Sequence, residues 1–312
     1  MIPKTMRAVV LTGPTKAEDI TLSKVSVPTV RPGWVLVKVR GFGMNHSEQI
    51  LRLTEIEADY IQKPIIPGIE CIGEVADPSD SGLRTGQKVV ALMGGMGRSF
   101  DGSYAEYALL PVRWSRCSTK PETYFTAWGS LFQCLHLQPS DTLLVRGGTC
   151  ALGYAAIQIA KALGCRVIAT THRKEKLPLL AGADETILDM GGLAGTVGPV
   201  NKVLELVGPK TLRDSLRSVT EGGIVCNTGI LGGVFILDRF DPIKEIPNGV
   251  FLTGFFSNYP TQTVMQNIFD FLDDHDLTPP VGAVYGFSEI QTACAALDSG
   301  AVNGKIVVEV DS

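Results

Sequence analysis

A cluster of small residues separates a short apolar segment from a long one in the stretch VRGGTCALGYAAIQIAKALGCRVIATTHRK, which starts at Val145. Its glycines are Gly147, Gly148 and Gly153. A pyrophosphate binds exposed backbone N–H groups at a helix N-terminus, where the helix dipole favours negative charge and bulky side chains would block its approach. The spacing departs from GxGxxG, so the prediction depends on the strand–turn–helix–strand context. The alternative is an ordinary turn before a buried helix.

The residues after the second strand of this unit indicate which dinucleotide would bind. NAD-binding proteins place Asp or Glu there for the ribose hydroxyls, whereas this strand ends Thr-Thr-His-Arg-Lys and the first acid is Glu175. Hydroxyl groups and a guanidinium bind phosphate, so we predict NADPH rather than NADH. The alternative is that the basic residues only begin a solvated helix. The predicted cofactor-binding residues of this unit are Gly148, Thr149, Cys150, Ala151, Leu152, Thr170, Thr171, Arg173 and Lys174.

Two patterns of secondary structure position these residues. Short apolar strands alternating with helices predict a parallel α/β sheet beyond residue 121, while the first third has short β-rich segments and turn residues typical of a barrel or sandwich. Ser288 and Gln291 fit a capping box, which predicts a helix start at Ser288. The predicted strands are Arg7–Leu11, Val35–Arg40, Ile69–Val75, Lys88–Leu92 and Ser103–Leu109 in the first third, then Thr142–Arg146, Cys165–Thr171, Glu185–Leu188, Lys202–Val207, Gly223–Thr228 and Val250–Phe255.

Length and composition exclude several classes of protein. With 312 residues, the chain is longer than one core usually supports, which predicts two domains. The formal charge is −4 and the sequence has no basic stripe, so no nucleic-acid partner is expected. No long apolar segment suits a secretion signal or a bilayer span, so we expect a cytoplasmic protein without membrane contact. The seven cysteines are scattered without CxxC, which predicts neither a disulfide framework nor a zinc ribbon.

Several further blocks follow one another along the chain: RAVVL, GFGMNHSEQ (41–49), PIIPGIECIGEV (64–75), GQKVVAL (86–92), GSYAEYALLP (102–111), FTAWGSL (125–131), the glycine turn and NGKIVVEV (303–310). In this order and spacing they resemble the medium-chain dehydrogenase/reductase superfamily, and within it the zinc-independent NADPH:quinone oxidoreductase group. The resemblance covers essentially the whole chain. It implies an α/β protein with a Rossmann-type parallel-sheet domain inserted in a β-rich GroES-like barrel domain. The implied ranges are 1–120 for the catalytic domain, 121–264 for the NADP-binding domain and 265–312 for the return to the first.

The same comparison predicts that no metal is bound. In the zinc alcohol dehydrogenases of the superfamily, the position of Asn45 is a Cys ligand and that of Ile69 is a ligand His. Glu70 remains, but a catalytic zinc needs three protein ligands of the Cys, His or carboxylate kind. The structural zinc would need four closely spaced cysteines, and the chain has none between Leu92 and Leu110. A zinc alcohol dehydrogenase is therefore nearly excluded.

The absence of zinc favours a conjugated acceptor. A simple ketone develops charge on one oxygen during reduction, whereas a quinone or an α,β-unsaturated carbonyl spreads that charge. The resemblance therefore implies NADPH-dependent reduction of a small hydrophobic quinone or enone, with catalysis mostly by orientation. It also implies a homodimer, in which the strand Val250–Phe255 at the sheet edge pairs across a two-fold axis.

The resemblance assigns further residues. Asn45 would lie near the nicotinamide, with a polar turn residue as the alternative. Some relatives carry tyrosines shortly after this Asn; here the nearest is Tyr60, a candidate proton donor, and protonation by solvent is the alternative. For the two phenylalanines, core or dimer packing is the alternative. The residues expected to border the cofactor are Thr126, Gly229, Phe255, Phe256, Asn303 and Lys305.

A second class of function is compatible with these features. The superfamily includes lens crystallins and other relatives used for structure or interaction. An NADPH-binding protein of the same fold without significant turnover is therefore the alternative to the oxidoreductase.

Overall fold

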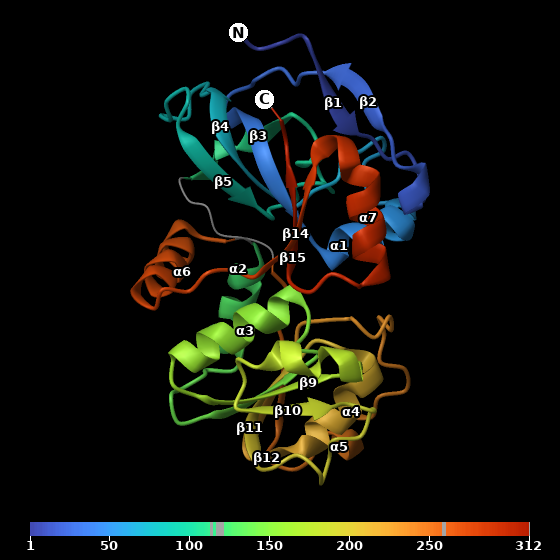
Figure 1. The fold of residues 1–312 in the computed structure, drawn as a ribbon, viewed down its shortest axis with the longest axis vertical. Helices are drawn as coiled ribbons and strands as arrows, with labels where there is room; N and C mark the ends of the chain where they lie inside the picture. The colour runs from blue at the N-terminus through green and yellow to red at the C-terminus, as the bar shows by residue number, and fades with distance from the viewer. Residues whose placement is uncertain (113–114, 117–121, 258–259, 312) are drawn as a thin grey trace. The chain divides into compact units, whose positions relative to one another are not determined.

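The computed structural model describes residues 1–112, 115–116, 122–257 and 260–311. The chain divides into two compact units (Figure 1). The domain boundary predicted at residues 120 and 121 lies outside the described residues, and the return predicted at 265 falls within helix α6 (Gln262–Asp274), whose residues are shared between the units. Unit 1 comprises Met1–Glu122, Asn258–Phe269 and Pro279–Ser312, and unit 2 comprises Thr123–Ser257 and Asp270–Thr278.

Unit 2 is built on a parallel sheet. Within the described residues its six strands lie in the order β10-β9-β8-β11-β12-β13, and every neighbouring pair is parallel. Counted along the chain, this is the order 3-2-1-4-5-6 of the doubly wound dinucleotide-binding fold. The predicted Rossmann-type sheet is thereby confirmed. The strands are β8 (Thr142–Arg146), β9 (Arg166–Thr171), β10 (Glu185–Leu188), β11 (Val200–Glu205), β12 (Val219–Asn227) and β13 (Phe251–Gly254).

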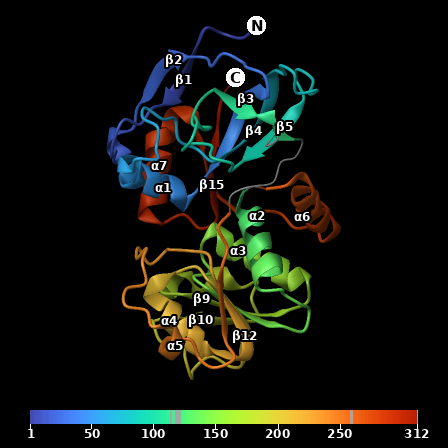
Figure 2. The ribbon, with the colours of Figure 1, turned by 180° about the vertical axis from the view of Figure 1, so that it is seen from behind.

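Helices cover this sheet because their apolar residues must be removed from water. Helix α3 (Ala151–Ala162) packs on β8 and β9, and α4 (Pro209–Ser218) packs on β11 and β12 (Figures 1 and 2). Gly164, with φ 91°, ends α3 in the left-handed conformation that glycine tolerates. The other helical segments of this part of the chain are α2 (Glu122–Trp128), the π-helix η4 (Gly129–Cys134), the 3₁₀ helix η5 (Lys174–Leu180) and α5 (Pro242–Glu245).

Unit 1 is β-rich, as the GroES-like prediction requires. Its larger sheet has the order β14-β15-β3-β4-β5-β7, with β6 also paired to β3, and β1 pairs with β2 in a separate ribbon (Figure 2). The last strand, β15, thus joins β3 from near the start of the chain. The strands are β1 (Thr5–Val9), β2 (Leu22–Ser26), β3 (Trp34–Met44), β4 (Glu70–Asp77), β5 (Lys88–Leu92), β6 (Tyr107–Pro111), β7 (Ser115–Arg116), β14 (Val281–Gly286) and β15 (Lys305–Glu309).

The helices of unit 1 include one whose predicted start is wrong. The 3₁₀ helix η6 (Phe287–Glu289) leads into α7 (Ile290–Ser299), and the backbone N–H of Gly286 donates to the Glu289 carboxylate at 2.8 Å. The Gln291 side chain instead donates to the carbonyl of Glu18, so Ser288 and Gln291 form no capping box. The remaining helices are α1 (His46–Leu53), η1 (Ala17–Asp19) and η2 (Glu55–Glu57).

No helix in the described part of the chain is both long and apolar enough to cross a membrane.

Candidate functional site

The turn between β8 and α3 presents backbone hydrogen-bond donors without backbone acceptors. Gly147 and Gly148 donate their N–H groups to the Thr170 hydroxyl and carbonyl, at 3.2 and 2.8 Å. The following backbone N–H groups, of residues 149 to 152, find no backbone acceptor among the described residues, and these residues are partly exposed. Free N–H groups at the start of a helix are the donors that a dinucleotide pyrophosphate requires.

Close packing within the turn explains its glycines. A Cβ at Gly153 would overlap the backbone of Gly148, and a Cβ at Gly148 would lie 3.0 Å from the Leu180 side chain. The Cys150 thiol sits at the N-cap of α3 and accepts the Gly153 N–H at 3.3 Å. Burial raises the pKa of this thiol, so Cys150 is a neutral cap. The turn therefore fits a dinucleotide: the backbone is accessible and no bulky group occupies it.

The end of β9 places the predicted phosphate-binding residues beside this turn. The hydroxyls of Thr149 and Thr171 lie 3.3 Å apart, and the Thr171 hydroxyl also accepts the Arg173 N–H at 3.3 Å. Among the residues that the structure describes, Arg173 and Lys174 form no ion pair. Burial and the nearby Arg173 lower the pKa of Lys176, and Glu175 opposes them.

A buried charge network supports this edge of the sheet, and the sequence reasoning missed it. Arg146 is fully buried at the end of β8. Its guanidinium donates to both carboxylate oxygens of Asp189, at 2.6 and 3.0 Å, and lies 2.7 Å from the Asp214 carboxylate. Glu205, at the end of β11, accepts the N–H groups of Val207 and Gly208 at 2.8 and 2.9 Å. A charged residue within the apolar run TLLVR was the available signal, because an arginine is rarely buried without partners.

Two other predicted cofactor residues of unit 2, Thr126 and Gly229, lie next to a pair of hydroxyl groups. The carbonyl of Thr126 accepts from Ser130 at 2.8 Å, and the Ser130 hydroxyl lies 2.9 Å from that of Thr228, next to Gly229. A Cβ at Gly229 would overlap the backbone of Leu206, which explains the glycine.

The two phenylalanines differ in their surroundings. The Phe255 ring packs on Phe125 and fills the space where a side chain at Gly129 would lie, so its side chain is a packing residue. The Phe256 side chain is 84% exposed.

Unit 1 contains the predicted catalytic Asn45 in a polar cluster with Glu70 and Lys305. The Lys305 ammonium lies 2.5 Å from the Asn45 side-chain oxygen and also pairs with Glu70 Oε1, while Asn45 Nδ2 donates to the same Oε1 at 3.1 Å. Glu70 Oε2 accepts the Glu122 N–H at 2.7 Å. Lys305 and Glu70 are both buried. Lys305, expected to face the cofactor, thus has its charge directed to Glu70 and Asn45.

Two predicted residues of unit 1 make separate contacts. The Tyr60 hydroxyl donates to Glu55 at 2.9 Å, Glu55 binds Arg98, and the Tyr60 side chain is largely exposed. Burial and Glu55 raise the pKa of Tyr60. The buried side-chain oxygen of Asn303 has no hydrogen-bond partner within the described part of the chain.

The donor set at Asn45 does not fit a catalytic zinc. Ile69 has no donor atom, the Asn45 oxygen contacts an ammonium, and the Glu70 carboxylate is shared between that ammonium and a backbone N–H. No group of three or more His, Cys, Asp or Glu side chains among the described residues could hold a metal ion. The six described cysteines are free thiols, and Cys117 lies outside the described residues.

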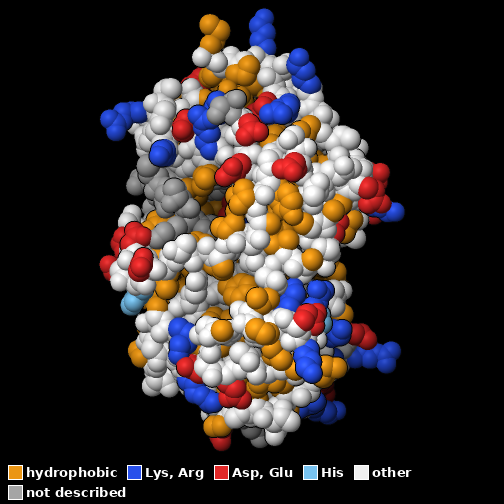
Figure 3. Space-filling model, viewed as in Figure 1, with side chains coloured by type: hydrophobic (Ala, Val, Ile, Leu, Met, Phe, Trp, Pro, Cys, Tyr) orange, Lys and Arg blue, Asp and Glu red, His pale blue; other side chains and the backbone are white. Residues whose placement is uncertain are grey.

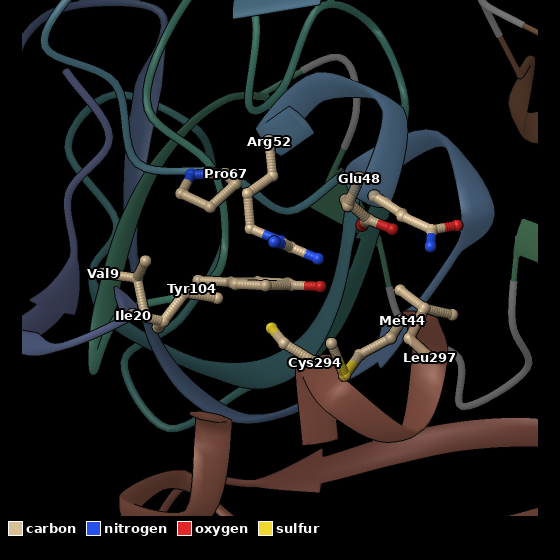
Figure 4. Close-up of a pocket in the computed structure, with 10 residues that line it drawn as sticks. Val9, Ile20, Met44, Glu48, Arg52, Pro67, Tyr104, Cys294 and Leu297 are labelled. Atoms are coloured by element: carbon tan, nitrogen blue, oxygen red, sulfur yellow. The ribbon is translucent and has the colours of Figure 1, made fainter. Parts of the chain in front are cut away.

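A small cavity next to the start of α1 is too small for a substrate. Its volume is about 10 Å³, enough for about one water molecule, and Figure 4 shows Arg52 extending over the Tyr104 ring with Glu48 beside them. Glu48 is buried, accepts the N–H groups of Asn45 and Ile69 at 2.5 and 3.1 Å, and its pKa is raised by burial to about 7. Glu48 therefore holds the backbone of Asn45 itself and of Ile69, the residue before Glu70.

Comparison with known proteins agrees with this geometry. Residues 31–122 match the alcohol dehydrogenase GroES-like domain family, and residues 181–308 match a family described as zinc-binding dehydrogenase. Quinone oxidoreductase of Rattus norvegicus is 30% identical over 250 residues, 72% of each chain. Putative quinone oxidoreductase YhfP of Bacillus subtilis is 26% identical over 323 residues, 94% of this chain and 96% of that one.

Solved structures share the whole fold. A putative alcohol dehydrogenase from Sinorhizobium meliloti 1021 has a TM-score of 0.83 at 27% identity, over 99% of this chain and 98% of that one. The quinone oxidoreductase from Coxiella burnetii has a TM-score of 0.84 at 22% identity, over 99% and 100% of the two chains.

Fold, turn and relatives together define a nicotinamide-dependent oxidoreductase with a Rossmann-type and a GroES-like part. The chain belongs to the medium-chain dehydrogenase/reductase superfamily, in its quinone oxidoreductase group. The resemblance noted in the sequence is thereby confirmed.

Proposed function

We propose that this oxidoreductase uses NADPH to reduce a quinone or another α,β-unsaturated carbonyl, without a metal. The observation that carries the cofactor assignment is the basic segment after β9. Arg173 and Lys174 follow β9 without an ion-pair partner in the described part of the chain, and no acid occupies the end of this strand. A 2′-phosphate supplies an anionic partner for these two side chains, and a free ribose hydroxyl does not.

The acceptor class follows from the groups at Asn45. Bound NADPH supplies a hydride, and the protein has to stabilise the negative charge that the acceptor gains. The cluster offers an amide group whose oxygen is bound by an ammonium, but no fitting metal donor set. Hydrogen bonds of this kind suffice for a conjugated acceptor because its charge is delocalised, whereas a simple ketone requires stronger stabilisation. The names of the rat and Bacillus subtilis relatives support the same class.

Two measurements test the proposal. NADPH should quench tryptophan fluorescence at lower concentration than NADH, and a panel of quinones and enones should oxidise NADPH, followed by its absorbance. Equal weak responses to both dinucleotides would contradict the cofactor assignment. No turnover across the panel despite tight NADPH binding would favour the alternative, an NADPH-binding protein without significant activity.

We further propose a homodimer formed along β13, and no nucleic-acid or membrane partner. Strand β13 is the edge of its sheet and exposes Phe251, which is 60% accessible. An apolar edge strand requires cover. On the face drawn in Figure 3, acidic and basic side chains are interspersed, which differs from the single-sign surface of a nucleic-acid binder.

A further inference from the structure

The Asn45 amide is oriented by two charged groups. The Lys305 ammonium carries only donors, so the Asn45 atom at 2.5 Å from it is the carbonyl oxygen. The Glu70 carboxylate only accepts, so the atom at 3.1 Å from it is the amide nitrogen. These two contacts allow one orientation of the Asn45 amide and exclude the flipped one.

This orientation is unusual for an asparagine at the start of a helix. Asn45 is the N-cap of α1, where an Asn side chain normally accepts a helix N–H. Here its oxygen faces Lys305, and the Asn45 backbone N–H is bound instead by the Glu48 carboxylate. The Asn45 side chain therefore makes no direct cap hydrogen bond, although Asn45 and Glu48 stand in capping-box positions.

One donor of the amide is left over. The side chain has two N–H groups, Glu70 takes one, and the second has no acceptor among the described residues. Asn45 is only half-buried. An ammonium bound to the amide oxygen draws electron density from the nitrogen and strengthens this remaining N–H as a donor.

The backbone is shaped to admit the ion pair. Gly43 lies on β3 opposite Val307 of β15, and a Cβ there would overlap both the Glu70 carboxylate and the Lys305 side chain. Two charges are costly to bury unless their geometry is good. This glycine lets them meet directly beside Asn45.

From this arrangement we propose that the Glu70–Lys305 ion pair positions and polarises Asn45, whose free amide N–H donates to the carbonyl oxygen of the acceptor. The proposal rests on the reductase function proposed above. Asn45 is then the catalytic residue, and Glu70 and Lys305 are positioning residues. The ion pair is neutral overall, and its ammonium end contacts the side chain that stands where zinc-dependent relatives carry a metal ligand.

Kinetics of four variants test the proposal. Asn45→Ala and Lys305→Met should each lower kcat for a quinone about 100-fold, the cost of one lost donor to an oxyanion, and leave the KM for NADPH unchanged. Lys305→Arg should retain most of the activity because it keeps a cation. Lys38→Met, on β3 of the same unit, is the control and should behave as wild type. If the wild-type protein is active and Asn45→Ala and Lys305→Met have the same kcat as it does, the inference is overturned and the reductase function stands.

Loss of the ion pair in Lys305→Met also lowers the stability of the fold. A double variant separates this effect from the effect on kcat. Glu70→Gln/Lys305→Met removes both buried charges and should recover the melting temperature lost in Lys305→Met. Its kcat should stay low because the amide is no longer oriented. Recovery of kcat together with stability would show that the pair is only structural.

A binding measurement separates this inference from the reductase function. 4-Nitrophenol imitates the reduced acceptor, because its phenolate places charge on one oxygen, and its ionisation is followed by absorbance. Wild type should lower the pKa of the bound phenol by about one, and Asn45→Ala should abolish that effect. A wild type without turnover on the panel contradicts the reductase function, and the phenol titration still decides the role of Asn45. Equal phenol pKa values in both proteins contradict the inference.

Discussion

The side chain of Arg173 carries the proposed preference for NADPH. Arg173→Ala should raise the dissociation constant for NADPH 10- to 100-fold, because it removes a charge-assisted bond to phosphate, and should change that for NADH less than threefold. Fluorescence titration with both dinucleotides measures this. Arg166→Ala, at the other end of the same strand and ion-paired with Glu185, is the matched control. An equal loss for both dinucleotides would show that Arg173 acts on the fold or on the shared pyrophosphate.

Individual residues of the site were predictable to different degrees. The proximity of Gly148 and Thr149 to the two threonines of β9 could be predicted because a strand–turn–helix–strand pattern is local in sequence. The contacts of Lys305 could not, because they depend on β15 pairing with a strand some 260 residues earlier. Phe255 was assigned by resemblance, and its side chain packs against Gly129, a contact that no local pattern contains.

At the scale of the element, the start of α3 depends on Gly153. Gly153→Ala should lower the free energy of unfolding by about 1–3 kcal/mol, because its Cβ would overlap the Gly148 backbone, and should weaken dinucleotide binding. Chemical denaturation and fluorescence titration measure the two effects. Gly192→Ala, where a Cβ meets nothing within 4 Å, is the control. A Gly153→Ala protein as stable as this control would refute the packing argument.

Helix α1 should give the protein a pH-dependent stability through Glu48. Burial raises the pKa of Glu48 from 4.5 to about 7, so the folded state retains a proton that the unfolded chain has lost. This contribution is fully present below about pH 4.5 and is lost as the pH rises through 7, by up to about 3 kcal/mol. Glu48→Gln should flatten this part of the pH profile of unfolding, and Glu57→Gln, an exposed neighbour, should not. Parallel profiles for wild type and Glu48→Gln would contradict the assignment.

Strands and helices were predicted best where one pattern decides them. The bounds of β5, β8 and β10 agree with the sequence predictions, since each is a short run with strand-forming residues and clear ends. No helix was predicted at α1, although its hydrophobic face is regular, because its residues were interpreted only as part of the GFGMNHSEQ motif. The capping box at Ser288 failed because a distant carbonyl, that of Glu18, binds Gln291.

For the whole molecule, the edge strand β13 predicts association. The protein should elute at twice the chain mass of 33.4 kDa in size-exclusion chromatography with light scattering. Phe251→Asp should shift it to the monomer, because a carboxylate cannot be buried unpaired in an apolar interface. Val281→Asp, similarly exposed on the edge strand β14, is the control and should remain dimeric. A wild-type monomer at micromolar concentration would contradict the proposal.

The pairing of β15 with β3 also has a consequence for synthesis on the ribosome. All six strands of the parallel sheet are translated before β15 begins, so unit 2 can complete its sheet while unit 1 still lacks a central strand. At about 5–20 residues per second, the first strands of unit 1 wait many seconds for Lys305. During that time Glu70 and Asn45 are without their cation, and β3 has an open edge that nascent-chain chaperones can bind.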